Sequence, residues 1–287
     1  MTKLEEQLVS IAESSPLYPK EWRGLPDAPK TLYAFGNTEL LKTRKFTIVG
    51  SRKTPANALK LGAQIAKDLS EVFSVVTGTA DGGDGAAIEG ALAGSGNVVC
   101  LLAGGFSAMP QNNLPLLRRV ARKGLLLSPQ SFDTPVRSFS YEYRNKLLAY
   151  LGEGTLVLGA AEKSGALITA KYATAAGKPV FAIPYAPGSL AGAGCNALLK
   201  KGGYLTENSV DISGRFGINL IEKKRAAPEL SADEKKMLGA LKELVEGHIS
   251  ELSQLSGVPA YKARAVLSSL EVKGLVAPLG GNRYAPV

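Results

Sequence analysis

Short, continuous apolar runs alternate with stretches of helical periodicity through the middle of this chain. The runs are rich in leucine and β-branched residues, and they span 46–50, 73–77, 97–105, 124–128, 155–159 and 178–184. Strands that are buried on both faces show such unbroken runs, because neither side meets water. Helical spacing appears between them, at 55–71, 84–93, 112–123 and 164–176. Repeated strand–helix units predict an α/β fold, with a Rossmann-like, doubly wound and mostly parallel sheet.

The two ends of the chain show different patterns. The first thirteen residues, MTKLEEQLVSIAE, have the spacing of an acidic amphipathic helix, and the rest of 1–45 is an irregular, Pro-rich segment. Segment 222–229 (EKKRAAPE) is charged and contains a proline, which is typical of a linker. We therefore expect four parts, which are an N-terminal helix and extension at 1–45, a core at 46–221, a linker at 222–229 and a small domain at 230–287.

Residues 230–287 predict a winged-helix domain. Ser231 with Glu234 three positions later is the pattern of a capping box at a helix start. A second helix, a turn at 257–259 and a third helix follow, and Gly-Gly-Asn at 280–282 suits the positive φ angles of a hairpin turn. The third helix carries few cations and has acidic neighbours, so duplex DNA binding and protein docking both stay open as its role.

Composition adds an electrostatic bias to this picture. The 287 residues include 34 Lys and Arg against 25 Asp and Glu, which gives a formal net charge of +9. An excess of positive charge favours polyanionic partners such as nucleic acids. Two cysteines, the absence of a secretory signal and the absence of a membrane-length apolar run indicate a cytoplasmic protein that does not cross a membrane.

The scarcity of histidine and cysteine restricts the chemistry. The only histidine, His248, lies far from every glycine-rich loop, whereas Ser–His or Cys–His catalysis needs a positioned base. Two cysteines and one histidine at these separations match no zinc-ligand spacing. We therefore expect no catalytic residue, no metal site and no cofactor.

Positively charged residues follow two of the predicted strands at the point where each strand ends. Segment 51–53 (Ser-Arg-Lys) comes after the first run, and 163–165 (Lys-Ser-Gly) comes shortly after the run at 155–159. Ligands of open α/β sheets bind beyond the carboxyl ends of the strands. The free N–H groups and the dipole of a helix start attract phosphate. The sequence thus predicts a site for a phosphate-bearing partner.

A glycine-rich loop, GTADGGDG at 78–85, also follows a predicted strand. It matches neither the G-x-G-x-x-G pattern nor a P-loop. Its acidic residues, Asp81 and Asp84, would repel phosphate. We expect only a tight turn between strand and helix at this position.

Segment 138–146 (SFSYEYRNK) combines aromatic and cationic residues. Aromatic side chains at 139, 141 and 143 stand next to Arg144 and Lys146. Aromatic faces beside cations suit the bases and phosphates of single-stranded nucleic acid. The same spacing also fits a strand with aromatic side chains in the core, in which Arg144 faces away from Tyr141. The sequence leaves both alternatives open.

Several of these segments, taken in their order, resemble the DNA-processing protein A family (DprA, also called Smf). The markers are GSR at 50–52, RN at 144–145, KSGALITA at 163–170, VFAIP at 180–184 and GCN at 194–196. The resemblance implies a cytoplasmic bacterial protein that binds and protects single-stranded DNA and helps load RecA recombinase in natural transformation. Such proteins typically form homodimers through the core and are not enzymes.

The resemblance also implies which residues hold the DNA. Segment 51–53 would contact phosphates, and Tyr141 would stack on a base or line the same groove. The full set of DNA-binding residues that the resemblance implies is Ser51, Arg52, Lys53, Tyr141, Arg144, Asn145, Lys146, Lys163, Ser164 and Gly165.

The chain departs from the family pattern at four positions. Asp81 stands where the family usually has Arg, Ile88 where it has His, Lys146 where it has a second Arg, and Met109 where it has a Tyr before proline. The negative charge of Asp81 should weaken anion binding at its loop or mark the retreat of that loop from the groove.

A nucleotide-binding enzyme or sensor is the main alternative function, because nucleotide-base hydrolases share the Rossmann-like core. As a family these hydrolases carry the signature P-G-G-x-G-T-x-x-E, of which 82–85 with Glu89 is only a faint echo. A transcriptional regulator with a ligand-sensing core is a third class.

Overall fold

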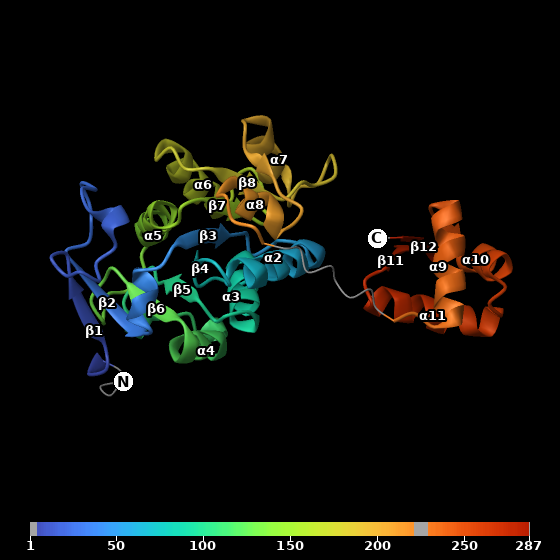
Figure 1. The fold of residues 1–287 in the computed structure, drawn as a ribbon, viewed down its shortest axis with the longest axis horizontal. Coiled ribbons are helices and arrows are strands. Elements are labelled where there is room, and N and C mark those ends of the chain that lie inside the picture. Colours follow the sequence, from blue (N-terminus) through green and yellow to red (C-terminus); the bar gives the residue numbers. More distant parts are fainter. Residues whose placement is uncertain (1–4, 221–228, 287) are drawn as a thin grey trace. The chain divides into compact units, whose positions relative to one another are not determined.

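The computed structural model describes residues 5–220 and 229–286 of the chain (Figure 1). The chain divides into two compact units, Met1–Glu222 and Lys223–Val287. The first is a sheet covered by helices, and the second is a small helical domain with a hairpin. Most of the segment predicted as a linker, 222–229, lies outside the described residues.

The first unit is built on one nine-stranded sheet with the order β1-β2-β6-β5-β4-β3-β7-β8-β9. Its strands are β1 Val9–Ala12, β2 Thr31–Gly36, β3 Lys45–Val49, β4 Ser74–Thr77, β5 Val98–Leu101, β6 Leu125–Ser128, β7 Thr155–Val157, β8 Val180–Ala182 and β9 Tyr204–Leu205. The seven strands from β6 to β9 pair in parallel, and β2 and β1 are added antiparallel at one edge. The prediction of a mostly parallel, doubly wound sheet is confirmed.

Helices cover both faces of this sheet. They are α2 Ala56–Leu69, α3 Gly83–Ala93, α4 Leu114–Lys123, α5 Ser138–Leu151, α6 Gly165–Ala175, α7 Ala193–Lys200 and α8 Ser209–Arg215. Neighbouring strand residues point to opposite faces, as in β3, where Ile48 packs into the cluster with α2, α3 and α4 and Val49 into the cluster with α5 and α6. Burial on both faces explains why these strands are unbroken apolar runs.

The predicted helix at the start of the chain is wrong from Val9 onward, where β1 begins; residues 1–4 lie outside the described part. Ile11 is buried while Val9 and Ser10 are exposed, so the segment buries one face only. β1 pairs with β2, and β2 pairs with β6. Segment 1–45 therefore contributes two strands to the sheet, β1 from the part predicted as a helix and β2 from the Pro-rich part, because the free edge of β6 offers hydrogen-bonding groups that must be satisfied.

The strand order places a topological switch between β3 and β7. From β3 the chain builds strands β4, β5 and β6 on one side, and it then crosses back to add β7, β8 and β9 on the other. In such folds the loops after the two switch strands run in opposite directions and leave a crevice for ligands. The segments 51–53 and 163–165 follow these two strands.

The second unit is a winged helix, as predicted. Its helices are α9 Ala232–Leu244, α10 Ile249–Ser256 and α11 Ala260–Val272, and its strands are β10 Gly247–His248, β11 Val276–Gly280 and β12 Arg283–Pro286. Ser231 and Glu234 form the expected capping box of α9. Gly280, Gly281 and Asn282 have positive φ in the wing turn. No helix among the described residues combines the length and apolarity needed to span a membrane.

Candidate functional site

The loop after β3 is a tight turn that joins β3 to β7. The backbone N–H of Ser51 donates to the carbonyl of Gly159 at 2.8 Å, which ties together the ends of the two switch strands. The Ser51 hydroxyl accepts from the N–H of Lys53 at 3.1 Å. Arg52 and Lys53 are exposed on this turn, and α2 starts directly after it.

The glycine loop after β4 crosses the β3 turn at very short range. A Cβ on Gly83 would lie 2.2 Å from the Cα of Gly50, and a Cβ on Gly82 would lie 2.7 Å from the Cα of Arg52. Gly82 also has φ of +76°, which disfavours other residues. Glycines at 82 and 83 therefore allow the start of α3 to pack directly against the turn after β3. This fits the tight strand–helix turn expected for segment 78–85.

Asp84 faces inward and is not a phosphate-repelling surface group. Its carboxylate is 5% exposed and accepts from the N–H of Ala80 at 3.3 Å. A Cβ on Gly78 would lie 2.2 Å from Oδ2 of Asp84 and 2.3 Å from Nη1 of Arg144, so both charged groups border the same small space. Burial raises the pKa of Asp84, and the positive charge of Arg144 opposes that shift.

Arg144 lies on α5, which resolves the alternatives that the sequence left open for 138–146 in favour of a helix. Its guanidinium is buried and donates to the carbonyl of Leu101 at 3.1 Å and to Oδ1 of Asn145 at 3.0 Å. Burial lowers the pKa of Arg144, and Asp84 and Tyr141 counteract that effect. Tyr141 lies one turn earlier on the same face and is 44% exposed.

Asn145 connects α5 to the start of α6. Its side-chain amide donates to the carbonyl of Gly165 at 3.1 Å. Ser164 is the N-cap of α6, because its hydroxyl accepts from the N–H of Ala166 at 3.3 Å. Lys163 is exposed directly before this cap. The free N–H groups at the start of α6 therefore follow directly after an exposed lysine, Lys163.

The candidate site therefore has an exposed layer and a buried layer around the β3/β7 switch. We call this arrangement the switch-point rim. Its exposed layer consists of Arg52, Lys53, Tyr141 and Lys163 with the half-exposed Ser51 and Ser164. Arg144 and Asn145 lie beneath it and hold its segments in place.

Lys146 is turned away from the switch-point rim. Its ammonium forms an ion pair of 2.6 Å with Asp27 and lies 5.9 Å from the centre of the Tyr172 ring. A residue two positions after Arg144 in a helix faces roughly the opposite side. The structure does not bring Lys146 together with the other residues named from the sequence.

The positions that depart from the family pattern have structural partners. Asp81 is exposed and accepts from the side-chain amide of Asn112. Ile88 is completely buried in the core between α3 and the sheet, where a polar side chain would lack a partner. Met109 packs at the border of the same core.

Sequence reasoning missed the role of Asp84 and Gly78 beneath the rim. Asp84 and Arg144, which both border Gly78, are far apart in the chain and belong to different strand–helix units. Only a signal of spatial contact, such as paired variation between relatives, would reveal such a contact in advance.

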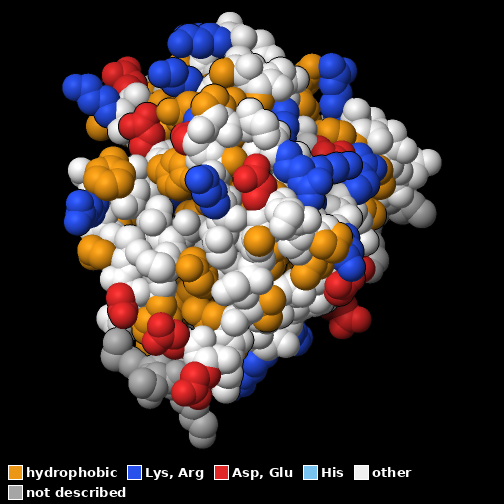
Figure 2. Space-filling model, turned by 90° about the vertical axis from the view of Figure 1, so that its left-hand side faces the viewer, with side chains coloured by type: hydrophobic (Ala, Val, Ile, Leu, Met, Phe, Trp, Pro, Cys, Tyr) orange, Lys and Arg blue, Asp and Glu red, His pale blue; other side chains and the backbone are white. Residues whose placement is uncertain are grey.

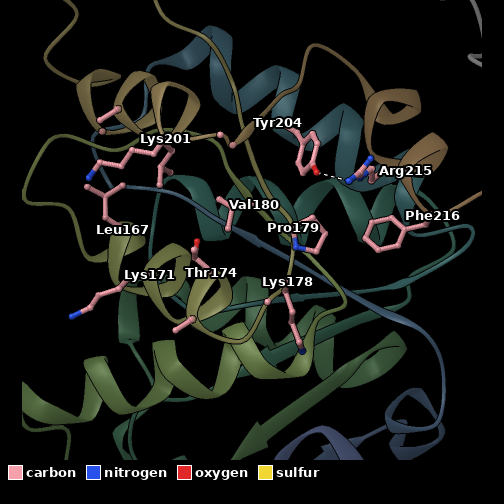
Figure 3. Close-up of a pocket in the computed structure, with 17 residues that line it drawn as sticks. Leu167, Lys171, Thr174, Lys178, Pro179, Val180, Lys201, Tyr204, Arg215 and Phe216 are labelled. Carbon is pink, nitrogen blue, oxygen red and sulfur yellow. Dashed lines mark hydrogen bonds between the residues drawn. The ribbon is translucent and has the colours of Figure 1, made fainter.

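A separate cavity of about 900 Å³ lies at the other end of β8, between α6, α7 and α8 (Figure 3). Residues from the last turns of these three helices border it, together with Leu167 and Gly194 from the first turns of α6 and α7. Arg215 stacks on the ring of Tyr204, and the Lys178 ammonium is bound by the carbonyl of Gly152 at 2.7 Å. Among the described residues, its lining also includes Lys171 and Lys201 and no acidic side chain, and it is distinct from the site at the β3/β7 switch.

Within residues 5–220 and 229–286, no group of three or more His, Cys, Asp or Glu side chains is arranged to hold an ion. Cys100 and Cys195 are both free and buried.

Comparisons with known proteins agree on one family. The family model described as DNA recombination-mediator protein A matches residues 9–217, and the model of the DprA winged helix domain matches 222–282. The DNA processing protein DprA of Bacillus subtilis is 34% identical over 183 residues, which is 63% of this chain and 62% of the relative. The chain thus spans less than two thirds of that relative.

Two solved structures are similar to this chain. DNA processing protein A from Streptococcus pneumoniae has a TM-score of 0.69 at 28% identity and covers 77% of both chains. DNA processing protein A from Helicobacter pylori, solved to describe its single-stranded DNA binding mode, has a TM-score of 0.67 at 28% identity. That match covers 73% of this chain and 95% of the other.

Proposed function

The chain belongs to the DNA recombination-mediator protein A family, and from this premise we propose that it is a cytoplasmic single-stranded DNA-binding recombination mediator. In this role it binds incoming DNA, protects it and helps load RecA recombinase in natural transformation. It acts by binding and not by catalysis. The observation that carries the proposal is the gathering of exposed cations and helix starts at the β3/β7 switch.

Phosphates of the strand are the groups that the switch-point rim suits best. Arg52 and Lys53 stand at the end of β3, and Lys163 stands before the N-cap of α6. Guanidinium and ammonium groups beside free helix N–H groups are a common arrangement for binding phosphate. We propose that these residues with Ser51, Ser164 and Gly165 contact the backbone of the DNA.

Tyr141 and the buried pair of α5 have different proposed roles. Tyr141 is exposed next to the rim cations, and its ring is available to stack on a base. Arg144 and Asn145 are buried, so we propose that they position the loops that touch the DNA. Lys146 has no role in this proposal, because its ammonium is bound to Asp27.

A homodimer through the core is the second part of the proposal. The sheet ends at β9, a two-residue strand that leaves its outer edge unpaired among the described strands, and Leu205 on it is 51% exposed. The cavity shown in Figure 3 lies beside this strand. An exposed strand edge next to apolar side chains favours association with another copy.

Light scattering tests the dimer. Because the chain has a mass of 30.0 kDa, a dimer would have twice that value. Leu205→Asp should shift the protein to the monomer, whereas Val9→Asp, at the opposite edge of the sheet, should leave the mass unchanged. A monomeric parent protein would contradict this part of the proposal.

Fluorescence anisotropy tests the DNA-binding part. We expect labelled single-stranded oligo-dT to bind more tightly than a duplex of the same length, and its affinity to fall steeply with salt. Nucleation of RecA on single-stranded DNA, with and without this protein, tests the loading role. Release of a free base from mononucleotides would contradict the proposal and favour a nucleotide hydrolase instead.

A further inference from the structure

A second cleft lies on the side of α5 that carries Phe139, Tyr143 and Lys146, away from the side that carries Arg144. It has a volume of about 480 Å³ and is open to solvent. Three aromatic residues dominate its lining, together with polar and charged side chains. The lining residues are Asp27, Gln130, Phe139, Glu142, Tyr143, Lys146 and Tyr172. We call it the aromatic cleft.

The aromatic cleft and the rim share one helix. Phe139 and Tyr143 are four residues apart on α5 and lie on one face, whereas Tyr141 and Arg144 lie on another. Tyr172 comes from α6, whose start carries Ser164 and Lys163. Phe139 precedes Tyr141, the rim residue that we propose to stack on a base, by two residues, which is roughly 3 Å along a helix axis. The aromatic cleft and the rim thus flank the first turns of α5 on different sides.

Hydrogen bonds hold two of the three rings of the aromatic cleft in place, and the third ring is exposed. Tyr143 donates its hydroxyl hydrogen to the carbonyl of Asp27 at 2.8 Å, and Tyr172 donates to Glu142 at 3.1 Å. Phe139 is 63% exposed, which is a large apolar surface to leave in water. Two fixed rings and one exposed ring form a preformed stacking surface.

The charges of the aromatic cleft suit a base better than a phosphate. Asp27 and Glu142 supply two carboxylates, and Lys146 supplies one ammonium that is already bound to Asp27. The net charge of the lining is thus negative, and a phosphate would be repelled. A nucleobase is neutral and can stack on the rings, whereas the phosphate of the same nucleotide must lie outside this negatively charged lining.

We propose that the aromatic cleft receives an unstacked base of the single strand whose phosphates are held at the switch-point rim. Phe139 is the stacking residue, and Tyr143 and Tyr172 form the fixed walls. The inference rests on the proposed function and deepens it, because it adds a base-binding subsite to a phosphate-binding rim. Figure 2 shows the face that carries the N-terminal strands, where hydrophobic side chains are exposed between Lys and Arg side chains.

The test uses the full-length protein and oligo-dT with one 2-aminopurine placed at successive positions. A base that stacks on an aromatic ring changes the fluorescence of 2-aminopurine. We expect one position to lose fluorescence on binding, and Phe139→Ala to restore it. The same variant should weaken binding about five- to hundredfold, the range that corresponds to one stacked base. Phe139→Trp should keep both properties.

Salt dependence separates this subsite from the rim. Phe139 is uncharged, so Phe139→Ala should keep the slope of affinity against salt, whereas Arg52→Ala should lower it. Val9→Ala, an exposed apolar position on β1, is the control and should bind like the parent protein. The inference would be overturned if Phe139→Ala bound oligo-dT with the affinity of the parent protein and showed the same 2-aminopurine fluorescence at every position. Salt-dependent binding in that experiment would still support the proposed function. Absence of any oligo-dT binding by the parent protein would overturn both.

Discussion

Arg144 and Asp84 both border Gly78, where the absence of a side chain leaves room for both charged groups. Nη1 of Arg144 and Oδ2 of Asp84 lie 2.3 and 2.2 Å from the position that a Cβ would occupy. The two residues come from α5 and α3, and both are buried beneath the switch-point rim. A glycine therefore leaves space for two opposite charges from two helices behind the exposed cations.

Gly78→Ala should destabilise the core unit. The added methyl group would overlap the guanidinium and the carboxylate, so we expect a loss of about 1–3 kcal/mol from overpacking. Urea unfolding followed by tryptophan fluorescence measures this, because Trp22 is buried in the same unit. Gly214→Ala is the matched control, since a Cβ there meets nothing within 4 Å on helix α8. An unfolding midpoint of Gly78→Ala equal to that of the parent protein would show that Arg144 and Asp84 do not fill the space beside Gly78.

Arg144→Ala should lower stability far more than Arg52→Ala. The first variant removes the bonds of the buried guanidinium to Leu101 and Asn145 and the positive charge near the buried Asp84 carboxylate, and losing buried charged groups of this kind typically costs about 3–5 kcal/mol. The second removes an exposed side chain and should leave unfolding unchanged. The double variant Asp84→Asn/Arg144→Met should recover part of the loss. If Arg144→Ala is fully stable but loses DNA binding, Arg144 touches DNA directly and our assignment of a positioning role is wrong.

The winged helix should lose stability in acid through Glu234. Lys273, the N–H of Ser231 and the hydroxyl of Ser269 bind its carboxylate and lower its pKa from the usual 4.5 to about 2. The pKa is lower in the folded state, so the stabilisation is fully present above about pH 4.5 and disappears as the pH falls through about 2.

Thermal unfolding of the winged-helix unit at decreasing pH measures this effect. Glu234→Gln and Lys273→Met should both flatten the dependence on pH in this range, because each removes the charged pair. Equal pH profiles for the parent protein and Glu234→Gln would contradict the role of this carboxylate.

The cations of α11 and of the β11–β12 hairpin in the winged-helix unit should contribute little to single-strand binding. Arg264 donates to Asn282 at 2.9 Å, Lys262 lies 4.0 Å from Asp233, and Arg283 lies 3.1 Å from Glu246. Partners within the same unit compete with phosphate for these groups. We expect Lys262→Ala/Arg264→Ala to keep the salt slope of oligo-dT binding. A drop as large as that of Arg52→Ala would show that this unit shares in the binding.

Local patterns were sufficient to predict most of the fold and part of the site. The central strands are buried on both faces, and this leaves an unbroken apolar run in each. The capping box of Ser231 is predicted from a neighbour three residues later, and this prediction is confirmed. Interactions between residues that are close in the chain can be predicted from a short stretch of sequence.

Other features depend on partners that are distant in the sequence. β1 forms because β2 presents a free edge, and its own residues alternate too briefly to predict a strand. In 138–146 the aromatic residues recur every second position, which imitates a strand, although the segment is a helix that separates Phe139 from Tyr141. The proximity of Asp84 to Arg144 cannot be predicted from the residues around either of them.

The salt dependence of oligo-dT binding tests most directly whether Arg52 and Lys163 hold the same strand. We expect Arg52→Ala and Lys163→Ala each to lower the slope of log affinity against log salt by roughly 0.7, and the double variant to combine both losses. Lys171→Ala, exposed further along α6, is the control and should keep the parent slope. A double variant with the parent slope would contradict the account.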